Sequence, residues 1–400
     1  MKSSLIDNVL KMCPDTKLAS RIVSGIRIRR IMSYFIPDKD VRLGESSSEE
    51  KKKIVDKYLS KEWIGIKKTA DLADRILSEA SQYKDREDKS DVKTDMLFKR
   101  LAYGFQPDEY LCYGLEGMEP EEMRKWISDL DRYIYIFSMN DLKTCQIFNN
   151  KSRTYEAFKE YYRRDAISIK NDSDYSKFEN FVSSHTEFVK KQAFQGMGRS
   201  IELVKSDAII PEEYFKQLIA EGEHIIEGRI QQSSVMSQLN ASSVNTVRCI
   251  TMNTKSGIKI LYTFLKVGRN GSFVDNGGAG GILAGIDENT GVINTHGYDE
   301  FITEYICHPD SNVEFVGYAF PYWNEMKNMC CEMAAKLPAV RCIGWDLALT
   351  DQGWVVVEGN GMTQFIGPQI IYKKGIKKEV LRLMKDMDLT GNRGKHGMRR

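Results

Sequence analysis

One segment near the C-terminus constrains the fold of this chain more than any other, because it joins two apolar runs through a short polar turn. The segment 343–365 reads IGWDLALTDQGWVVVEGNGMTQF. Asp351, Gln352 and Gly353 separate the runs. A glycine after a polar pair between two β-rich runs is typical of a hairpin. We therefore predict two antiparallel strands joined by this turn.

Three side chains of this hairpin are candidate metal ligands. Asp346 lies in the first run, and Glu358 and Asn360 end the second. Residues at i and i+2 of a strand point to the same face, and a hairpin register can place Asp346 opposite them. Two carboxylates and an amide oxygen form a hard ligand set that suits Mg²⁺ held together with phosphate. The alternative is an ordinary hairpin with solvated polar ends. The apolar strands weigh against it, since a buried carboxylate needs a cation or donors.

The pattern D-x-A-x-T, a turn and V-V-E-G-N resembles the metal-binding hairpin of ATP-grasp enzymes, most closely the sugar-transfer-associated branch. Upstream blocks fit the same branch in the same order: FVKKQAFQGMGRSI from Phe188, IIEGRIQQ from Ile225 followed by SSVNTVRCIT, and VDNGGAGGI from Val274. The resemblance spans roughly residues 101–360. It implies an α+β protein whose two α/β subdomains clamp ATP. The expected parts are a helical N-terminal region (1–130), a first subdomain with a glycine-containing lid (131–225) and a second with the hairpin (226–400).

Composition limits the partners of the chain. Of its 400 residues 42% are hydrophobic and 28% charged, and the net charge of +2 gives no strong field toward nucleic acid or membrane. The eight cysteines form no CxxC pair, as is usual in a reducing compartment. The N-terminus lacks the apolar core of a secretion signal, and no apolar run approaches the roughly 20 residues of a membrane span. We therefore expect a cytoplasmic protein.

The N-terminal region contains three further signals. Residues 15–36 predict an amphipathic helix with clustered arginines, which packs on its own domain or, in a less favoured alternative, contacts an anionic membrane peripherally. Residues 37–53 are so polar that we expect a mobile linker. Gly104, Pro107 and Tyr110 match a G-x-x-P-x-x-Y segment that precedes the catalytic domain in the resembled family. A structural and a substrate-related role for that segment both remain open.

The resemblance implies two lysines for the nucleotide. Lys143 matches the lysine that opens the nucleotide-binding part, although a surface helix lysine is the alternative. Lys191 matches the strand lysine that faces the nucleotide. Lys190 points to the opposite face of the same strand, so only one of the two can face the cleft. The following loop, residues 195–200, resembles the flexible lid.

The strand IIEGRIQQ resembles the hinge segment that lies against the adenine ring. The resemblance implies that backbone groups of Glu227, Arg229 and Ile230 read the edge of the base, and that Gln232 occupies the polar position after them. An ordinary strand between domains is the alternative.

Arg248 is the strongest candidate for catalysis. Strand alternation puts it on one face with Thr246, and an arginine in mid-strand is costly unless it is paired. Its planar fork suits phosphate or acyl-phosphate oxygens. The glycine-rich stretch DNGGAGG adds Asp275 and Asn276, the side chains there that can do polar work. The predicted catalytic set is Arg248, Lys191, Asp275 and Asn276.

By resemblance, the expected function is an ATP- and Mg²⁺-dependent, ADP-forming ligase. It would activate a carboxylate as an acyl phosphate for attack by an amine or thiol, in polysaccharide or sugar-conjugate biosynthesis. The expected partner is a small-molecule or sugar-conjugate substrate and not nucleic acid. The main alternative is a kinase of the same fold acting on a hydroxyl group. A non-catalytic ATP-binding module and a peripheral membrane assembly factor remain further alternatives.

Overall fold

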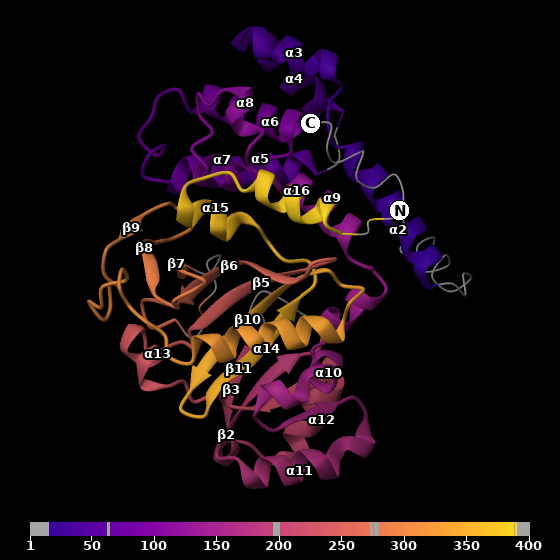
Figure 1. Cartoon of the computed structure of the whole chain (residues 1–400), viewed down its shortest axis with the longest axis vertical. Helices are drawn as coiled ribbons and strands as arrows, with labels where there is room; N and C mark the ends of the chain where they lie inside the picture. The colour runs from indigo at the N-terminus through magenta and orange to yellow at the C-terminus, as the bar shows by residue number, and fades with distance from the viewer. Residues whose placement is uncertain are drawn as a thin grey trace.

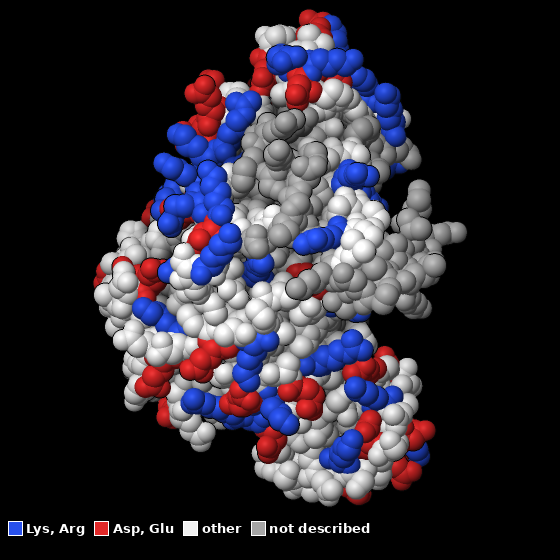
Figure 2. All heavy atoms as spheres, turned by 45° about the vertical axis from the view of Figure 1, so that its right-hand side comes forward, with Lys and Arg blue, Asp and Glu red and all other residues white. Residues whose placement is uncertain are grey.

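The computed structural model describes residues 16–61, 65–194, 201–272, 275, 280–387 and 389. It confirms an α+β fold with a helical N-terminal region. Figure 1 shows the N-terminal helices at the top, a large sheet with its helices in the middle, and a smaller sheet flanked by helices at the bottom. Figure 2 shows side chains of both charges interspersed over that lower lobe. No helix among the described residues is long and apolar enough to cross a membrane.

The N-terminal helices enclose apolar clusters of their own. The segment expected to be a mobile linker, 37–53, is instead helical, and this prediction was wrong. Val41, Ile54 and Val55 are buried, so apolar residues spaced by a helical turn decide the structure despite the polar composition. The helices are α2 (Thr16–Met32), α3 (Asp38–Ser46), α4 (Ser48–Ser60), α5 (Ile66–Glu79), α6 (Lys89–Tyr103), α7 (Pro107–Cys112), α8 (Pro120–Met123) and α9 (Asp129–Met139).

The basic helix predicted over residues 15–36 is α2, and its apolar side packs against α9. Val23, Ile28 and Ile31 share a buried cluster with residues of α9. The guanidinium of Arg27 lies 5.4 Å from the ring centre of Phe137, a cation–π contact. The buried side of this helix therefore packs on the protein itself.

The small sheet has the strand order β1-β4-β2-β3 in the described part of the chain, with every neighbouring pair antiparallel. The expected subdomain boundary at 225/226 falls inside β4, an interior strand of this sheet. The elements of this part are η1 (Thr144–Asn149), α10 (Lys151–Tyr162), β1 (Ala166–Ile169), η2 (Asp172–Asp174), α11 (Tyr175–Ser184), β2 (Glu187–Gln192), β3 (Ile201–Lys205), η3 (Ser206–Ala208), α12 (Pro211–Glu221) and β4 (His224–Gly228).

The large sheet has the order β11-β10-β5-β6-β7-β8-β9 among the described residues. The predicted hairpin is confirmed: β10 and β11 pair antiparallel around the turn at Asp351 and Gln352, and β11 forms the edge nearest the small sheet. The elements are α13 (Ser234–Leu239), β5 (Thr246–Thr254), β6 (Gly257–Val267), β7 (Ile282–Ile286), β8 (Ile293–Tyr298), β9 (Glu304–Tyr305), α14 (Trp323–Lys336), β10 (Cys342–Thr350), β11 (Gly353–Asn360), α15 (Ile366–Tyr372) and α16 (Lys377–Lys385).

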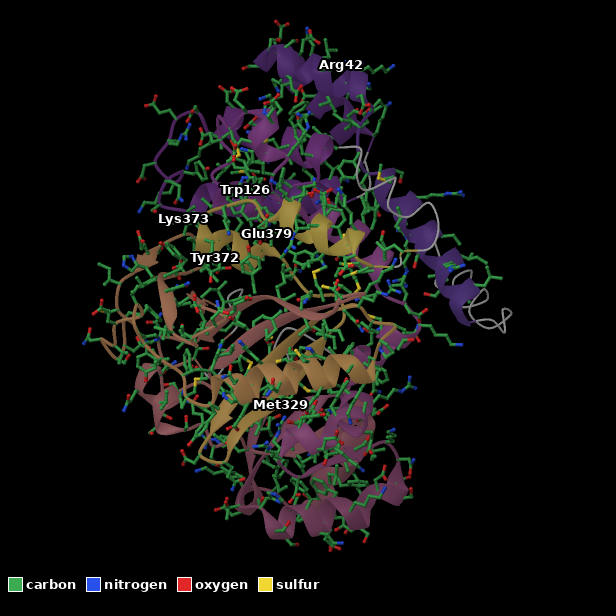
Figure 3. The ribbon with its side chains drawn as sticks, viewed as in Figure 1. Arg42, Trp126, Met329, Tyr372, Lys373 and Glu379 are labelled. Atoms are coloured by element: carbon green, nitrogen blue, oxygen red, sulfur yellow. The ribbon has the colours of Figure 1, made fainter. Side chains whose placement is uncertain are left out.

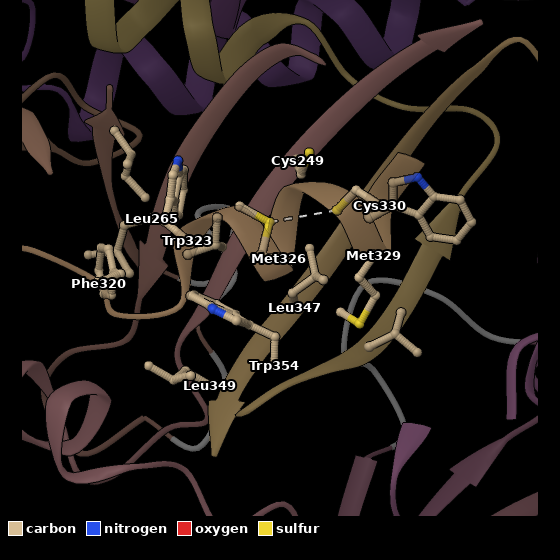
Figure 4. Packing of buried hydrophobic residues seen from close by; sticks show 14 of the residues in the cluster. Cys249, Leu265, Phe320, Trp323, Met326, Met329, Cys330, Leu347, Leu349 and Trp354 are labelled. Carbon is tan, nitrogen blue, oxygen red and sulfur yellow. Dashed lines mark hydrogen bonds between the residues drawn. The ribbon is translucent and has the colours of Figure 1, made fainter. Parts of the chain in front are cut away.

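Helices cover both faces of the large sheet. On one face α14 directs Met326, Met329 and Cys330 against buried strand residues such as Leu347 and Trp354 (Figure 4). On the other face α9, α15 and α16 pack over Ile250, Met252 and Phe264. Along each strand, side chains therefore alternate between the core under α14 and the core under α9, α15 and α16. On the second face, some strand positions carry charged side chains instead of apolar ones.

The N-terminal region docks on α15 and α16 through a buried glutamine. Gln369 is fully buried; its Oε1 accepts from the backbone N–H of Ile127 at 2.8 Å, and its Nε2 donates to the Ile127 carbonyl at 3.0 Å and to the Tyr113 hydroxyl at 2.8 Å. Trp126 lies beside α15 and α16, the yellow helices that carry Tyr372 and Glu379 (Figure 3). One side chain thus satisfies two backbone groups across this junction.

We expect Gln369→Leu to lower the free energy of unfolding by about 3 kcal/mol, because it leaves the N–H and C=O of Ile127 buried without partners at about 1–3 kcal/mol each. Urea unfolding followed by circular dichroism measures the change. The matched control is Gln352→Leu in the exposed hairpin turn, which should change stability by less than about 0.5 kcal/mol. Equal stability of the two variants would show that Gln369 does not hold the junction.

Candidate active site between the two sheets

A cavity of about 280 Å³ lies between the small sheet and the edge of the large sheet. The small-sheet side contributes Lys191 and Glu227, and α10 contributes Lys151. Glu358 and Asn360 line the opposite side from β11. Cations on one side thus face a carboxylate and an amide on the other. This arrangement can hold a polyanion together with a divalent cation.

The two neighbouring lysines of β2 face opposite ways. Lys191 lines the cavity, and its Nζ lies 2.9 Å from Oε2 of Glu227. Lys190 points to the other face, where it pairs with Glu202 at 2.7 Å and with Glu221 at 3.4 Å. Strand alternation therefore puts Lys191, the preferred candidate, in the cavity.

Glu227 is a buried anchor for two cations. Arg164 donates to its Oε2 at 2.7 Å, alongside Lys191. Burial alone would raise the pKa of Glu227, but the charges of Lys191 and Arg164 outweigh it and lower this pKa to about 2. Arg164 also donates to the backbone oxygen of Val356 in β11 at 2.8 Å, so it ties the small sheet to the large one. Sequence reasoning missed Arg164, and no local pattern marks it.

Lys151, and not the predicted Lys143, lines the cavity. Lys143 is exposed at the start of η1 and does not line the cavity. Lys151, the first residue of α10, lines it and donates to the backbone oxygen of Gln192 at 2.8 Å. Burial, the largest influence, lowers the pKa of Lys151. Lys151 is the lysine that sequence reasoning missed, although it stands only eight positions after Lys143.

Of the four residues predicted to lie against the adenine ring, one lines the cavity and three do not. Glu227 lies in an interior strand, paired with Ala166 on one side and Val189 on the other, and its side chain lines the cavity. Arg229, Ile230 and Gln232 do not line it. Arg229 is exposed and pairs with Glu187 at 2.8 Å.

Gln232 has structural partners. Its Nε2 donates to the backbone oxygens of Asn240 and Ser243, both at 2.8 Å, and its Oε1 accepts from the N–H of Asn245 at 3.0 Å. These bonds hold the loop that leads into β5. The side chain is therefore occupied by backbone groups and not presented to a ligand.

The hairpin brings the three predicted metal ligands together. Asp346 and Glu358 are register partners, and Asn360 donates to Oε1 of Glu358 at 3.0 Å. No group of three or more His, Cys, Asp or Glu suited to a metal occurs among the described residues. Mg²⁺ held with phosphate needs only one or two carboxylates, so two carboxylates and an amide fit it. These oxygens are thus a suitable donor set.

Asp346 is also the centre of a buried ion network. Nη2 of Arg248 donates to its Oδ2 at 2.8 Å and Nε of Arg248 to its Oδ1, while Lys266 lies 3.3 Å from Oδ2. Burial opposes the charge, but the two cations outweigh it and lower the pKa of Asp346 to about 2. Lys266 also lies 3.5 Å from Asp275, which accepts from the hydroxyl of Thr246. Burial raises the pKa of Asp275. Asn276 and the loop 195–200 lie outside the described residues.

Strand register arranges these groups in a row. Glu358, Asp346 and Arg248 are successive partners across β11, β10 and β5, and Thr246 pairs with Lys266 one step along the same face. The row begins at the cavity beside β11 and ends at Arg248 and Lys266, which line a second cavity of about 260 Å³. Charged groups thus connect the two cavities across the sheet.

Comparison with known families agrees with this geometry. The model of the sugar-transfer associated ATP-grasp family matches residues 131–385, well over half of the chain. The chain therefore belongs to the sugar-transfer-associated ATP-grasp family. No protein of curated function matches the sequence.

Solved structures show distant likenesses. The D-alanine-D-alanine ligase from Coxiella burnetii has 10% identity and a TM-score of 0.39, over 64% of this chain and 60% of that one. The N5-carboxyaminoimidazole synthetase from Staphylococcus aureus complexed with ADP has 12% identity and a TM-score of 0.41, over 64% of this chain and 58% of that one. The ATP-grasp ligase PsnB complexed with minimal precursor, Mg and ADP has 11% identity and a TM-score of 0.37, over 62% of this chain and 61% of that one. The chain spans about three fifths of each of these proteins, and the likenesses are too distant to indicate a substrate.

The lysine pair of β2 provides a matched test of the cavity. We expect Lys191→Ala to weaken ATP binding by about tenfold or more, because a charge-assisted contact to phosphate is worth roughly 1.5–3 kcal/mol. Lys190→Ala removes the same side chain from the other face and should change the affinity by less than about twofold. Isothermal titration calorimetry with ATP measures both. A larger loss for Lys190→Ala would place the nucleotide on the other face of the small sheet.

Proposed function

We propose that this protein is an ADP-forming ligase that activates a carboxylate as an acyl phosphate and transfers the acyl group to an amine or thiol. The observation that carries the proposal is the row of charges from Glu358 through Asp346 to Arg248 and Lys266. It joins a cavity suited to a nucleotide with a second cavity able to hold an acceptor. The family's association with sugar transfer supports an acceptor from sugar-conjugate or polysaccharide synthesis.

In this mechanism Lys151 and Lys191 hold the ATP phosphates from the small-sheet side. Glu358, Asn360 and Asp346 would hold Mg²⁺, which neutralises charge on phosphate oxygens when bound. The acceptor carboxylate approaches from the second cavity, and Arg248 and Lys266 offset its repulsion from the triphosphate.

The chemistry then proceeds in two steps that these residues orient. A carboxylate oxygen bonds to the γ-phosphorus while the bond from phosphorus to the bridging oxygen of ADP breaks. The attacking amine or thiol then bonds to the carbonyl carbon, and inorganic phosphate leaves with the C–O electron pair. The first step needs no strong base, since the carboxylate is already the nucleophile. Positioning and charge compensation are therefore the main contributions of the protein.

A kinase acting on a hydroxyl group is the second candidate, and Asp275 favours it. This buried carboxylate lies beside Thr246 and Lys266 at the inner end of the row, and its raised pKa suits a group that accepts a proton. A hydroxyl acceptor that reached Asp275 past Lys266, which lines the second cavity, would lose its proton to this base. The two candidates differ in where the γ-phosphate ends.

Labelled ATP separates the two reactions. The protein is incubated with ATP carrying label in its γ-phosphate, a mixture of carboxylic acids and sugars, and hydroxylamine. A ligase gives hydroxamates together with labelled free phosphate, since hydroxylamine traps the acyl phosphate. Label in a hydroxylamine-resistant ester, with no free phosphate, would overturn the ligase and leave the kinase.

We expect Glu358→Gln to reduce ATP-dependent turnover at least about 100-fold at saturating Mg²⁺, a loss of about 2.7 kcal/mol of transition-state stabilisation. The variant keeps the shape of the side chain and removes one ligand charge. Asp351→Asn, in the exposed turn of the same hairpin, is the matched control and should keep near-normal turnover. Normal turnover of Glu358→Gln would exclude the hairpin as the metal site.

A further inference from the structure

The second cavity lies where the helical N-terminal region meets the large sheet. Its walls come from α5 and α7 on one side and from β5, β6 and α15 on the other. Its volume of about 260 Å³ is slightly below the usual range of ligand pockets, about 300–1,000 Å³. An occupant would therefore be small, and it would touch the N-terminal region as well as the ATP-grasp core.

One end of this cavity is cationic. Arg248 and Lys266 line it from neighbouring strands, and their side chains are only 13% and 12% exposed. Both already pair with Asp346, which belongs to the hairpin row. A carboxylate of the occupant would reach these cations from the cavity side, next to the row that leads to the nucleotide.

The middle of the cavity is apolar. Phe264 and Leu283 line it from the sheet, Leu111 from α7 and Ile370 from α15. These side chains offer no hydrogen-bond donor or acceptor to an occupant. They therefore favour a hydrocarbon portion between its polar ends.

The α7 side of the cavity carries Asp108, a carboxylate with no salt-bridge partner among the described residues. Asp108 and Glu300 line it, and neither forms an ion pair within the described structure. Oδ1 of Asp108 accepts the backbone N–H of Glu109 at 2.9 Å. Burial raises the pKa of both carboxyls. Neighbouring Asp299, by contrast, is paired with Arg269 at 3.0 Å. Arg75 also lines the cavity; it is exposed, and its charge opposes the rise in the pKa of Glu300 without forming a salt bridge to it.

The local fold explains how Asp108 reaches the cavity. Gly104 ends α6 with φ +85°, and a Cβ there would lie 2.7 Å from Leu130. Pro107 begins α7, and the hydroxyl of Tyr110 donates to Asp95 at 2.8 Å. These contacts give Gly104, Pro107 and Tyr110 of the G-x-x-P-x-x-Y segment a part in shaping the local backbone. They fix the short helix that presents Asp108 to the cavity.

We propose that the second cavity binds an acceptor with a carboxylate at Arg248 and Lys266, an apolar body, and a positively charged amino group at Asp108 and Glu300. The proposal rests on the ligase function, because it identifies the activated carboxylate with the end beside the nucleotide. An occupant with only an anionic head would leave Asp108 without a positively charged partner. An ammonium group supplies three donors and the missing charge.

The probes are straight-chain ω-amino acids from β-alanine to 8-aminooctanoate, each compared with the carboxylic acid and the alkylamine of equal chain length. Binding to the full chain is measured by calorimetry in the presence of Mg²⁺ and a non-hydrolysable ATP analogue. We expect at least one amino acid to bind about tenfold more tightly than both monofunctional partners. Asp108→Asn should remove this advantage over the carboxylic acid and leave the affinity for the acid unchanged.

Asp71→Asn, on the exposed part of α5, is the matched control and should retain the preference. Where Asp108→Asn does not fold, Glu300→Gln carries the same test. An amino acid that binds no more tightly than the acid of equal length overturns the proposal, as does the absence of binding by every probe. Binding without hydroxamate formation from ATP would contradict the ligase alone. Hydroxamate formation from acids without an amino-acid preference would contradict the acceptor alone.

Discussion

The ion pair between Asp346 and Arg248 is the interaction on which the site depends. Asp346 is only 2% exposed, in the interior of a seven-stranded sheet, where an unpaired carboxylate would cost several kcal/mol. Arg248 compensates it from the neighbouring strand β5, and Lys266 from β6, the next strand beyond β5. Removing either charge would leave the other buried and unpaired. The sheet can therefore carry ions on a face that is otherwise apolar only if these strands keep their register.

The same register explains how a continuous row of charged side chains joins the two cavities. In an antiparallel sheet, partner residues project from the same face about 5 Å apart, so a row of partners crosses the strands in a straight line. Glu358, Asp346 and Arg248 form such a row, and the irregularity after Asp346 changes the pairing of β11 beyond this point. A slip of one residue would turn the row into the α14 core. The alternating apolar residues of β10 fix its register and thereby keep the charged groups on one face of the sheet.

Local rules recovered the parts of the site that lie within single elements. The turn residues predicted the hairpin, and alternation separated Lys191 from Lys190. Positions that depend on packing between distant segments were not recoverable. Lys151 reaches the cavity because α10 packs beside the small sheet and β11. Arg164 anchors Glu227 because the chain before β1 passes beside β11. The segment 37–53 looked like a linker because its buried residues are few, although Ile54 and Val55 just beyond it fix its helices against α6.

The N-terminal region has a consequence for substrate choice. In the proposed mechanism the groups that touch ATP belong to the two sheets and to α10, whereas Asp108 and Leu111 belong to α7. The same region is held to α15 by Gln369, whose neighbour Ile370 lines the second cavity. Rotation of α7 relative to α15 would change the acceptor cavity without moving the nucleotide cavity. Selection of the acceptor therefore belongs to the junction between the helical region and the core, while phosphoryl transfer belongs to the core alone.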